Sequence, residues 1–344
     1  MHNKGRHITL FTLLGIALTV LFLADLSLGA VSIPIKDVAK SLLGDIPSKT
    51  SWQYIILDYR LPKAITAVLA GIGLSIGGLL MQTLFRNPLA GPDVLGLSSG
   101  ASLGVAFVIL GSGFLPGILA GFFTSSYGIV LASTIGSFAV LMAVLAVAQR
   151  LKDTMAILIV GLMFSSFTGA IVGVLTYFSS AEKLQKYTFW ALGSLGNLPW
   201  HNILVLAFVV VIGLVLAIVC IKPLDALLLG ERYAKSLGIN FNRTRLIIIL
   251  ATSLLTGCVT AFAGPIAFVG LVVPHMAKLL FKTSSHKILF IATLLCGATL
   301  MLLCDIGTQL PGKAFVLPIN AITSIVGAPV VVGLLLSKRK GIFS

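Results

Sequence analysis

The sequence predicts an all-α membrane protein, a polytopic bundle of about ten transmembrane helices that forms a single domain over residues 1–344. Composition is the first reason, because 58% of the residues are hydrophobic and only 10% are charged, whereas a soluble domain carries about 25% charged residues. The second reason is that uncharged runs long enough to cross a bilayer recur along the chain. The basic residues lie in short clusters between these runs, a distribution that sets membrane orientation and does not predict nucleic-acid binding.

The first half of the chain contains six predicted spans. The first uncharged run follows a short basic start, and we expect it to be an uncleaved anchor and not a signal peptide. A later run, 94–149, is too long for one helix, and the glycine-rich stretch 111–117 divides it into two spans. Between the fifth and sixth spans, Trp190 and Trp200 bound a stretch that we expect to be a short helix or re-entrant piece at the outer face. The six spans are residues 8–24, 64–85, the two parts of 94–149, 154–181 and 201–221.

The second half contains four predicted spans. Residues 246–277 could form one long span or two short ones, with Gly264 and Pro265 in the middle. The positive-inside bias favours two spans, because only then does the basic cluster at 338–340 lie in the cytoplasm. The last two spans are then residues 288–304 and 319–336, and both termini are cytoplasmic.

The longest polar, helix-compatible stretch is residues 222–245, between the sixth and seventh spans; we call it the coupling segment. It carries five basic and two acidic residues, and this basic excess favours the cytoplasmic side. Glu231 to Leu237 can form a short helix that ends at Gly238, since glycine just past the last helical residue is a usual stop signal. Such a segment offers a rigid contact surface to a soluble partner.

The spans contain few groups suited to catalysis or metal binding. The four cysteines lie in apolar segments without a C-x-x-C pair, so we predict no metal site, no disulfide frame and no cofactor. Asp305 lies at the outer end of a span, where we expect capping or hydration. The hydroxyls of Ser165, Ser166 and Thr168 could line a pathway, although such hydroxyls more often bond to their own helix. These observations disfavour an ion-coupled secondary transporter and a membrane enzyme.

Several motifs together resemble the FecCD-like family, the permeases of iron-siderophore, haem and vitamin B12 ABC importers. They are RLPK at residues 60–63, NPLAxPDxLGxSxGA at 87–101, WxxGSL at 190–195, AxxLGxN at 234–240, FxGPIxFVGLVxPH at 262–275 and LPxxxxTxxxGAP at 317–329. The similarity runs from about residue 10 to residue 337. It implies the fold of a type II ABC importer permease, with ten spans and two related halves.

The resemblance also implies partners, location and cargo. A permease of this family works in the cytoplasmic (inner) membrane of a bacterium, as a homodimer or paired with a related permease. Two cytoplasmic ATP-binding subunits hydrolyse ATP, so the permease itself is not an enzyme. A periplasmic or lipid-anchored substrate-binding protein delivers the cargo. The resemblance favours an iron-siderophore complex as cargo, with cobalamin or haem as alternatives.

Two groups of residues match functional positions of the family. At the outer end, Arg60 and Lys63 match a basic pair that receives acidic residues of the binding protein, and such rim charges steer docking. Gln309 stands where the family can have a third docking arginine, and Lys313 is the candidate substitute. At the inner end, the residues that match the ATPase-coupling positions are Leu229, Glu231, Arg232, Ala234, Leu237 and Gly238.

Overall fold

Nearly all of the described chain is helical. The only β-type pairing among the described residues is an isolated antiparallel bridge between Gln309 and Val316. This architecture confirms the predicted all-α membrane fold. The computed structural model describes residues 2–114, 125–150, 154–196, 198–309 and 315–337.

The described residues include ten apolar helices that occupy the ten predicted spans. Seven of them are long and apolar enough to cross a membrane, and three are shorter. Residues 246–277 contain two of these helices, as the charge distribution predicted. The ten helices are α1 (His2–Ser27), α4 (Leu61–Leu84), α5 (Leu97–Ile109), α7 (Ser126–Arg150), α8 (Thr154–Tyr177), α10 (Trp200–Val219), α13 (Phe241–Ala263), α14 (Val269–Phe281), α15 (His286–Thr308) and α16 (Ile319–Ser337).

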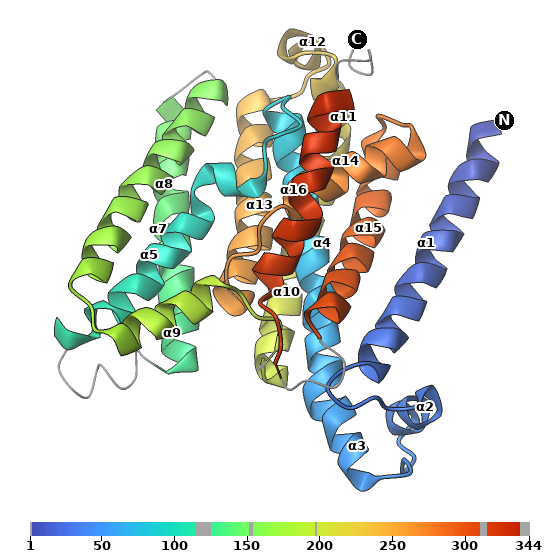
Figure 1. Ribbon diagram of the computed structural model, residues 1–344. Helices are drawn as coiled ribbons and strands as arrows, with labels where there is room; N and C mark the ends of the chain where they lie inside the picture. The colour runs from blue at the N-terminus through green and yellow to red at the C-terminus, as the bar shows by residue number, and fades with distance from the viewer. Residues whose placement is uncertain (1, 115–124, 151–153, 197, 310–314, 338–344) are drawn as a thin grey trace.

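Shorter helices connect the spans at the two ends of the bundle. Their bounds are α2 (Ile35–Leu43), α3 (Thr50–Tyr54), η1 (Ile55–Arg60), η2 (Pro92–Leu95), η3 (Gly111–Phe114), α9 (Ala181–Ala191), α11 (Ile221–Leu228) and α12 (Glu231–Ser236). Figure 1 shows α12 at one end of the bundle and α2, α3 and α9 at the other. In the same view, α1 begins and α16 ends on the face that carries α12.

The predicted position of the outer short helix is wrong. We expected a short helix or re-entrant piece between Trp190 and Trp200, whereas the short helix α9 ends at Ala191 and the next helix begins at Trp200. The helix forms earlier in the chain, where Glu182 and Lys186 are spaced one turn apart and form an ion pair of 3.0 Å. Such pairs add modest support to an exposed helix. The segment after α9 instead bonds to other elements, and Ser194 N donates to the carbonyl of Ala263 over 2.8 Å.

The helix α4 lies at the centre of the bundle and contacts α10, α13, α14 and α15. Of the most apolar part of the continuous helix Thr50–Leu84, 78% is buried, against 17% for α8. Glycines permit this burial, because a Cβ at Gly78 would overlap the carbonyl of Gly270, and one at Gly71 would overlap that of Gly297. The backbones of α4, α14 and α15 therefore touch directly, the arrangement that small residues allow in membrane helices.

Two short helices, α5 and α14, mark a repeat in the architecture. Each is 13 residues long, and each is the second member of a group of four spans. A residue with positive φ precedes each of them, Gly96 at 75° and Phe268 at 67°. A positive φ redirects the chain and is uncommon for a residue other than glycine. The matching position and length of α5 and α14 fit the two related halves that the motifs imply.

Substituting Gly78 by alanine should destabilise the bundle, because backbone atoms of α14 occupy the space that the new Cβ needs. Overpacking of this kind costs about 1–3 kcal/mol, so we expect the melting temperature of the purified protein in detergent to fall by several degrees. Gly169→Ala in α8 is the matched control, since a Cβ there meets nothing within 4 Å. Equal melting temperatures for the two variants would refute direct backbone contact between α4 and α14.

Candidate functional site

Most of the coupling segment, residues 222–240, lies outside the spans and contains the predicted short helix, whereas residues 241–245 begin α13. Its helix α12 begins at Glu231 after Gly230 and ends before Gly238, and these glycines have φ values of 112° and 79°. Positive φ at both positions explains why the segment needs glycine there. The side chains of Glu231 and Arg232 lie outside the described part of the structure.

The coupling segment exposes apolar side chains. Leu229 is 66% exposed and Leu237 is 57% exposed, and Tyr233 lies between them with half its surface exposed. Ala234 is instead fully buried, so it attaches α12 to the rest of the chain. Large apolar side chains that are exposed on a polar segment are typical of an interaction surface.

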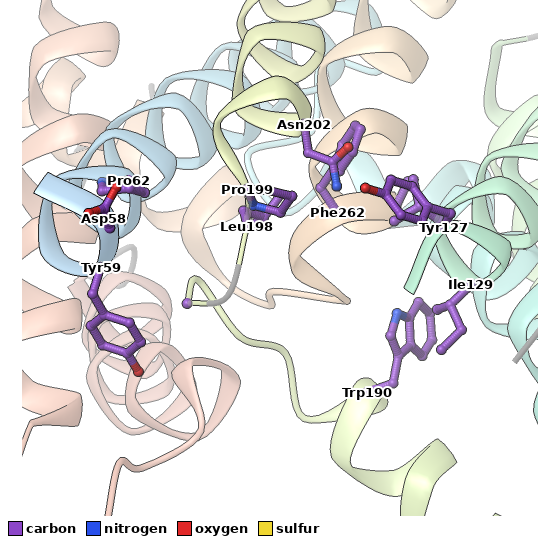
Figure 2. Close-up of a pocket in the computed structure, with 13 residues that line it drawn as sticks. Asp58, Tyr59, Pro62, Tyr127, Ile129, Trp190, Leu198, Pro199, Asn202 and Phe262 are labelled. Carbon is purple, nitrogen blue, oxygen red and sulfur yellow. The ribbon is translucent and has the colours of Figure 1, made fainter. Parts of the chain in front are cut away.

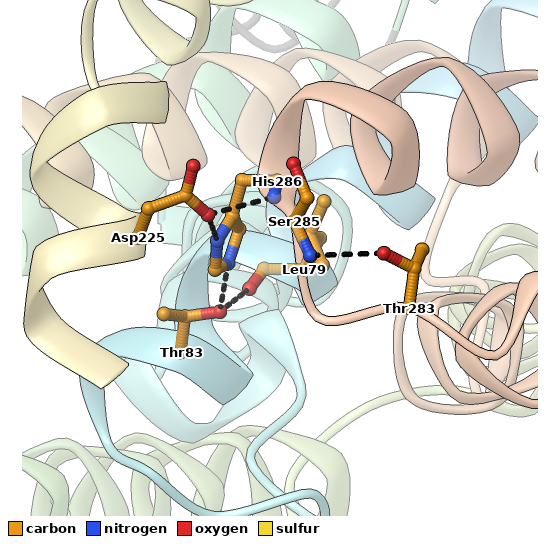
Figure 3. A network of polar contacts seen from close by, with 6 residues as sticks. All are labelled: Leu79, Thr83, Asp225, Thr283, Ser285 and His286. Carbon is orange, nitrogen blue, oxygen red and sulfur yellow. Dashed lines mark hydrogen bonds and ion pairs between the residues drawn. The ribbon is translucent and has the colours of Figure 1, made fainter. Parts of the chain in front are cut away.

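Polar contacts join the coupling segment to the bundle on both sides. At the start of α13, the side chain of Asn240 accepts a hydrogen bond of 3.1 Å from Arg243 N, as an N-cap residue does. In α11, Asp225 Oδ1 accepts a hydrogen bond of 2.8 Å from the backbone N–H of His286 and lies 2.7 Å from His286 Nδ1 (Figure 3). Sequence reasoning missed this second contact, because nothing in the local pattern relates α11 to the start of α15.

Arg60 lies at the opposite end of the bundle and is buried. Its Nη1 donates hydrogen bonds of 2.8 Å to the carbonyls of Leu26 and Ser27, and its Nη2 donates to the carbonyl of Val31. Leu26 and Ser27 are the last residues of α1, whose final carbonyls have no partner within the helix. The guanidinium therefore satisfies these carbonyls and ties the end of α1 to the start of α4, at the end of the bundle that the charge pattern predicts to be the outer one.

Lys63 forms a buried ion pair with Asp305, the acidic residue at the outer end of α15. The Nζ–Oδ1 distance is 2.8 Å, and the side chains are 8% and 1% exposed. The expectation that Asp305 is capped or hydrated is therefore wrong. Next to this pair, Gln309 Nε2 donates to the buried carboxylate of Asp25 over 3.2 Å.

The outer ends of α1, α4 and α15 thus gather two cations and two carboxylates, the group that we call the outer charge cluster: Asp25, Arg60, Lys63 and Asp305. Sequence reasoning placed the two cations on an exposed rim, whereas the structure gives both of them partners within the chain. Lys313, the third predicted docking residue, lies outside the described residues.

The three predicted pathway hydroxyls lie on α8, and two of them bond to their own helix. Ser165 Oγ donates to the carbonyl of Gly161 over 3.1 Å, and Thr168 Oγ1 donates to that of Phe164 over 2.9 Å. Ser166 is exposed on the outside of the bundle. Thr168 is buried within the chain, so only Ser166 and part of Ser165 would face a second chain packed against α8.

A cavity of about 600 Å³ opens at the end of the bundle that carries α9. Figure 2 shows Trp190, Tyr127 and Phe262 around it, together with Tyr59 and Asn202. An adjoining cavity of about 400 Å³ shares Tyr127, Asn202 and Phe262 and continues between α7 and α13. Aromatic walls with a few polar groups are typical of small-molecule sites. Sequence reasoning missed the cavity because its walls come from six helices that are spread over residues 58–262 of the sequence.

The described residues contain no group of three or more histidine, cysteine or acidic side chains that could hold a metal ion.

Known proteins resemble the chain over nearly its whole length. The FecCD transport family matches residues 17–337. The hemin transport system permease protein HmuU of Yersinia pestis is 33% identical over 326 residues, which cover 94% of each protein. The vitamin B12 import system permease protein BtuC of Klebsiella pneumoniae is 35% identical over 290 residues, which cover 83% of this chain and 84% of BtuC.

A solved structure supports the same relationship. One chain of an ABC transporter assigned to the metal-chelate type, in an inward-facing conformation, matches with a TM-score of 0.82. The two chains are 28% identical, and the match covers 96% of this chain and 99% of the other.

Breaking the Lys63–Asp305 pair from one side should destabilise the bundle. In Lys63→Met, Asp305 becomes a buried carboxylate without its cation, and losing one partner of a buried pair costs about 3–5 kcal/mol. We expect the melting temperature in detergent to fall sharply. The double variant Lys63→Met with Asp305→Leu should recover most of the loss, since two apolar side chains need no partner. A double variant that melts no higher than Lys63→Met would contradict this account.

Proposed function

Because the chain belongs to the FecCD transport family, we propose that it carries an iron-siderophore complex across the cytoplasmic membrane of a bacterium. The chain is a multi-pass permease of an ABC importer of the metal-chelate type, since the family match spans residues 17–337 and similar proteins are import permeases. A separate pair of ATPase subunits supplies the energy, and the permease itself hydrolyses nothing. A substrate-binding protein delivers the cargo to the outer face.

The exposed apolar surface of the coupling segment carries this proposal. Leu229, Tyr233 and Leu237 are exposed, and α12 lies at one end of the bundle (Figure 1). The ATPase is the partner that would cover these side chains. Movement of the ATPase on binding ATP would shift α12 and α11 and change the packing of the spans. In this arrangement the face with α12 is cytoplasmic, and so are both termini.

The opposite face receives the substrate-binding protein. Docking at Arg60 or Lys63 would require an exchange of partners, because both head groups are already bonded within the chain. An incoming carboxylate would compete with the α1 carbonyls for Arg60 and with Asp305 for Lys63. Such an exchange would link docking to the packing of α1, α4 and α15.

A second permease chain, identical or related, covers α8 in this proposal. Only 17% of the apolar part of α8 is buried within one chain. Two chains that face each other along α8 would place the exposed Ser166 and the half-buried Ser165 near their seam, where a polar pathway could form. Thr168 is buried within one chain, so it would join such a pathway only after α8 shifted. The family resemblance supports such a pair.

The nature of the cargo rests on the family resemblance, in which iron chelates are common. The similar proteins HmuU and BtuC are permeases for hemin and vitamin B12, so haem and cobalamin are the alternatives. All three are bulky chelates, and the aromatic walls of the outer cavity suit the apolar surface of any of them. An ion-coupled mechanism is the less favoured alternative, and uptake that persists with ionophores while ATP is maintained would exclude it.

Replacing Leu237 by aspartate should release the ATPase partner. The substitution puts a charge into the apolar contact, and central contact residues of this kind contribute enough to change affinity about tenfold or more. We expect the variant to fold normally and to lose its co-purifying ATPase. Leu43→Asp is the matched control, because Leu43 is 81% exposed on α2 at the opposite face. Normal transport and retained ATPase in Leu237→Asp would remove the coupling role from this segment.

The cargo can be identified by capturing the binding protein that stimulates the complex. In vesicles that contain permease and ATPase, we expect this binding protein, loaded with a ferric siderophore, to support ATP-dependent uptake. The same vesicles should take up neither haem nor cobalamin. Uptake of haem or cobalamin alone would assign the cargo to that chelate instead.

A further inference from the structure

A single buried histidine connects the coupling segment to the centre of the bundle. His286, the first residue of α15, is 1% exposed, whereas the side chain of Asp225 in α11 is 42% exposed. One oxygen of Asp225 meets both the backbone N–H and the ring Nδ1 of His286, at 2.8 and 2.7 Å. The carboxylate of Asp225 thus contacts the first residue of α15 at two atoms (Figure 3).

The other ring nitrogen of His286 reaches α4. Nε2 lies 2.9 Å from Thr83 Oγ1, and that hydroxyl also donates to the carbonyl of Leu79 over 3.0 Å. Thr83 is buried near the inner end of α4. Through one imidazole ring, α11 is therefore bonded to both α15 and α4, and α11 packs against both helices.

The helices α4 and α15 are joined along their whole length. At the outer end, Lys63 is paired with Asp305, and near the middle the backbones touch at Gly71 and Gly297. The inner and outer contacts are about 30 Å apart along each helix at roughly 1.5 Å per residue, which is close to the thickness of the hydrocarbon core. A displacement applied at the inner end of this pair must therefore appear at its outer end.

We propose that the contacts from Asp225 through His286 to Thr83 transmit movement between the coupling segment and the outer charge cluster, with α4 and α15 moving as one unit. Asp225 and His286 are positioning residues in this role: they act through the helices that they hold. The inference rests on the proposed function, since it requires an ATPase to move α12 and α11. A network that merely capped α15 would affect folding and assembly without changing how well ATP hydrolysis drives transport.

The test compares three variants of the assembled complex with its ATPase and binding protein. Asp225→Ala removes both contacts to His286, and Thr83→Val removes the hydroxyl at nearly constant volume. Asp225→Asn keeps an oxygen that can accept both hydrogen bonds. Lys287→Ala is the matched control, because Lys287 is the exposed neighbour of His286. The measurements are the amount of bound ATPase, the rate of ATP hydrolysis with and without binding protein, and the cargo transported per ATP.

We expect Asp225→Ala to keep its ATPase while transport per ATP falls about tenfold, the effect of losing hydrogen bonds to a charged group. Stimulation of ATP hydrolysis by the binding protein should fall with it, because in this proposal a signal from the docking face reaches the ATPase through the same contacts. Thr83→Val should show a smaller loss of the same kind, and Asp225→Asn and Lys287→Ala should resemble the wild type.

Three results would overturn the proposal: normal transport per ATP in Asp225→Ala, loss of the ATPase from that variant, or an Asp225→Asn variant as impaired as Asp225→Ala. A wild-type chain that bound no ATPase at all would instead refute the proposed function.

Discussion

Direct backbone contact along α4 is the constraint on which the rest of this structure depends. In lipid, helices gain little from burying apolar side chains against each other, so close packing at small residues must hold them together. Gly71 and Gly78 let α15 and α14 approach α4 until their backbones touch. A charged group carried into this interior is costly unless it finds a partner within the protein.

That requirement explains the chemistry at the two ends of α4. At the outer end, Arg60 and Lys63 would be costly if buried alone, and the carbonyls of α1 and the carboxylate of Asp305 satisfy them. At the inner end, Thr83 is satisfied through His286. The proposed contact surface for the ATPase and the proposed docking face for the binding protein are therefore both connected to the same central helix.

The sequence was sufficient for features that depend on local pattern. Uncharged runs predicted the spans, and Gly238 predicted the end of α12. The distribution of basic residues predicted that two helices, and not one, cover residues 246–277. Long-range contacts were different, because no local pattern relates Lys63 to Asp305 or Asp225 to His286. The outer short helix was predicted too late in the chain because its position was inferred from the two tryptophans. The ion pair that supports α9 lies before both of them.

The length of the continuous helix Thr50–Leu84 has a consequence for how a small movement at one end of the bundle affects the other end. Its 35 residues extend about 52 Å at roughly 1.5 Å per residue, well beyond a hydrocarbon core of about 30 Å. The excess turns, α3 and η1, pack against α1 and α2 at the end of the bundle that carries these helices. A tilt of one degree about the Leu84 end of the continuous helix displaces its Thr50 end by about 0.9 Å, as follows from that helical rise. A tilt too small to alter the packing at the Leu84 end thus becomes a much larger displacement at the Thr50 end.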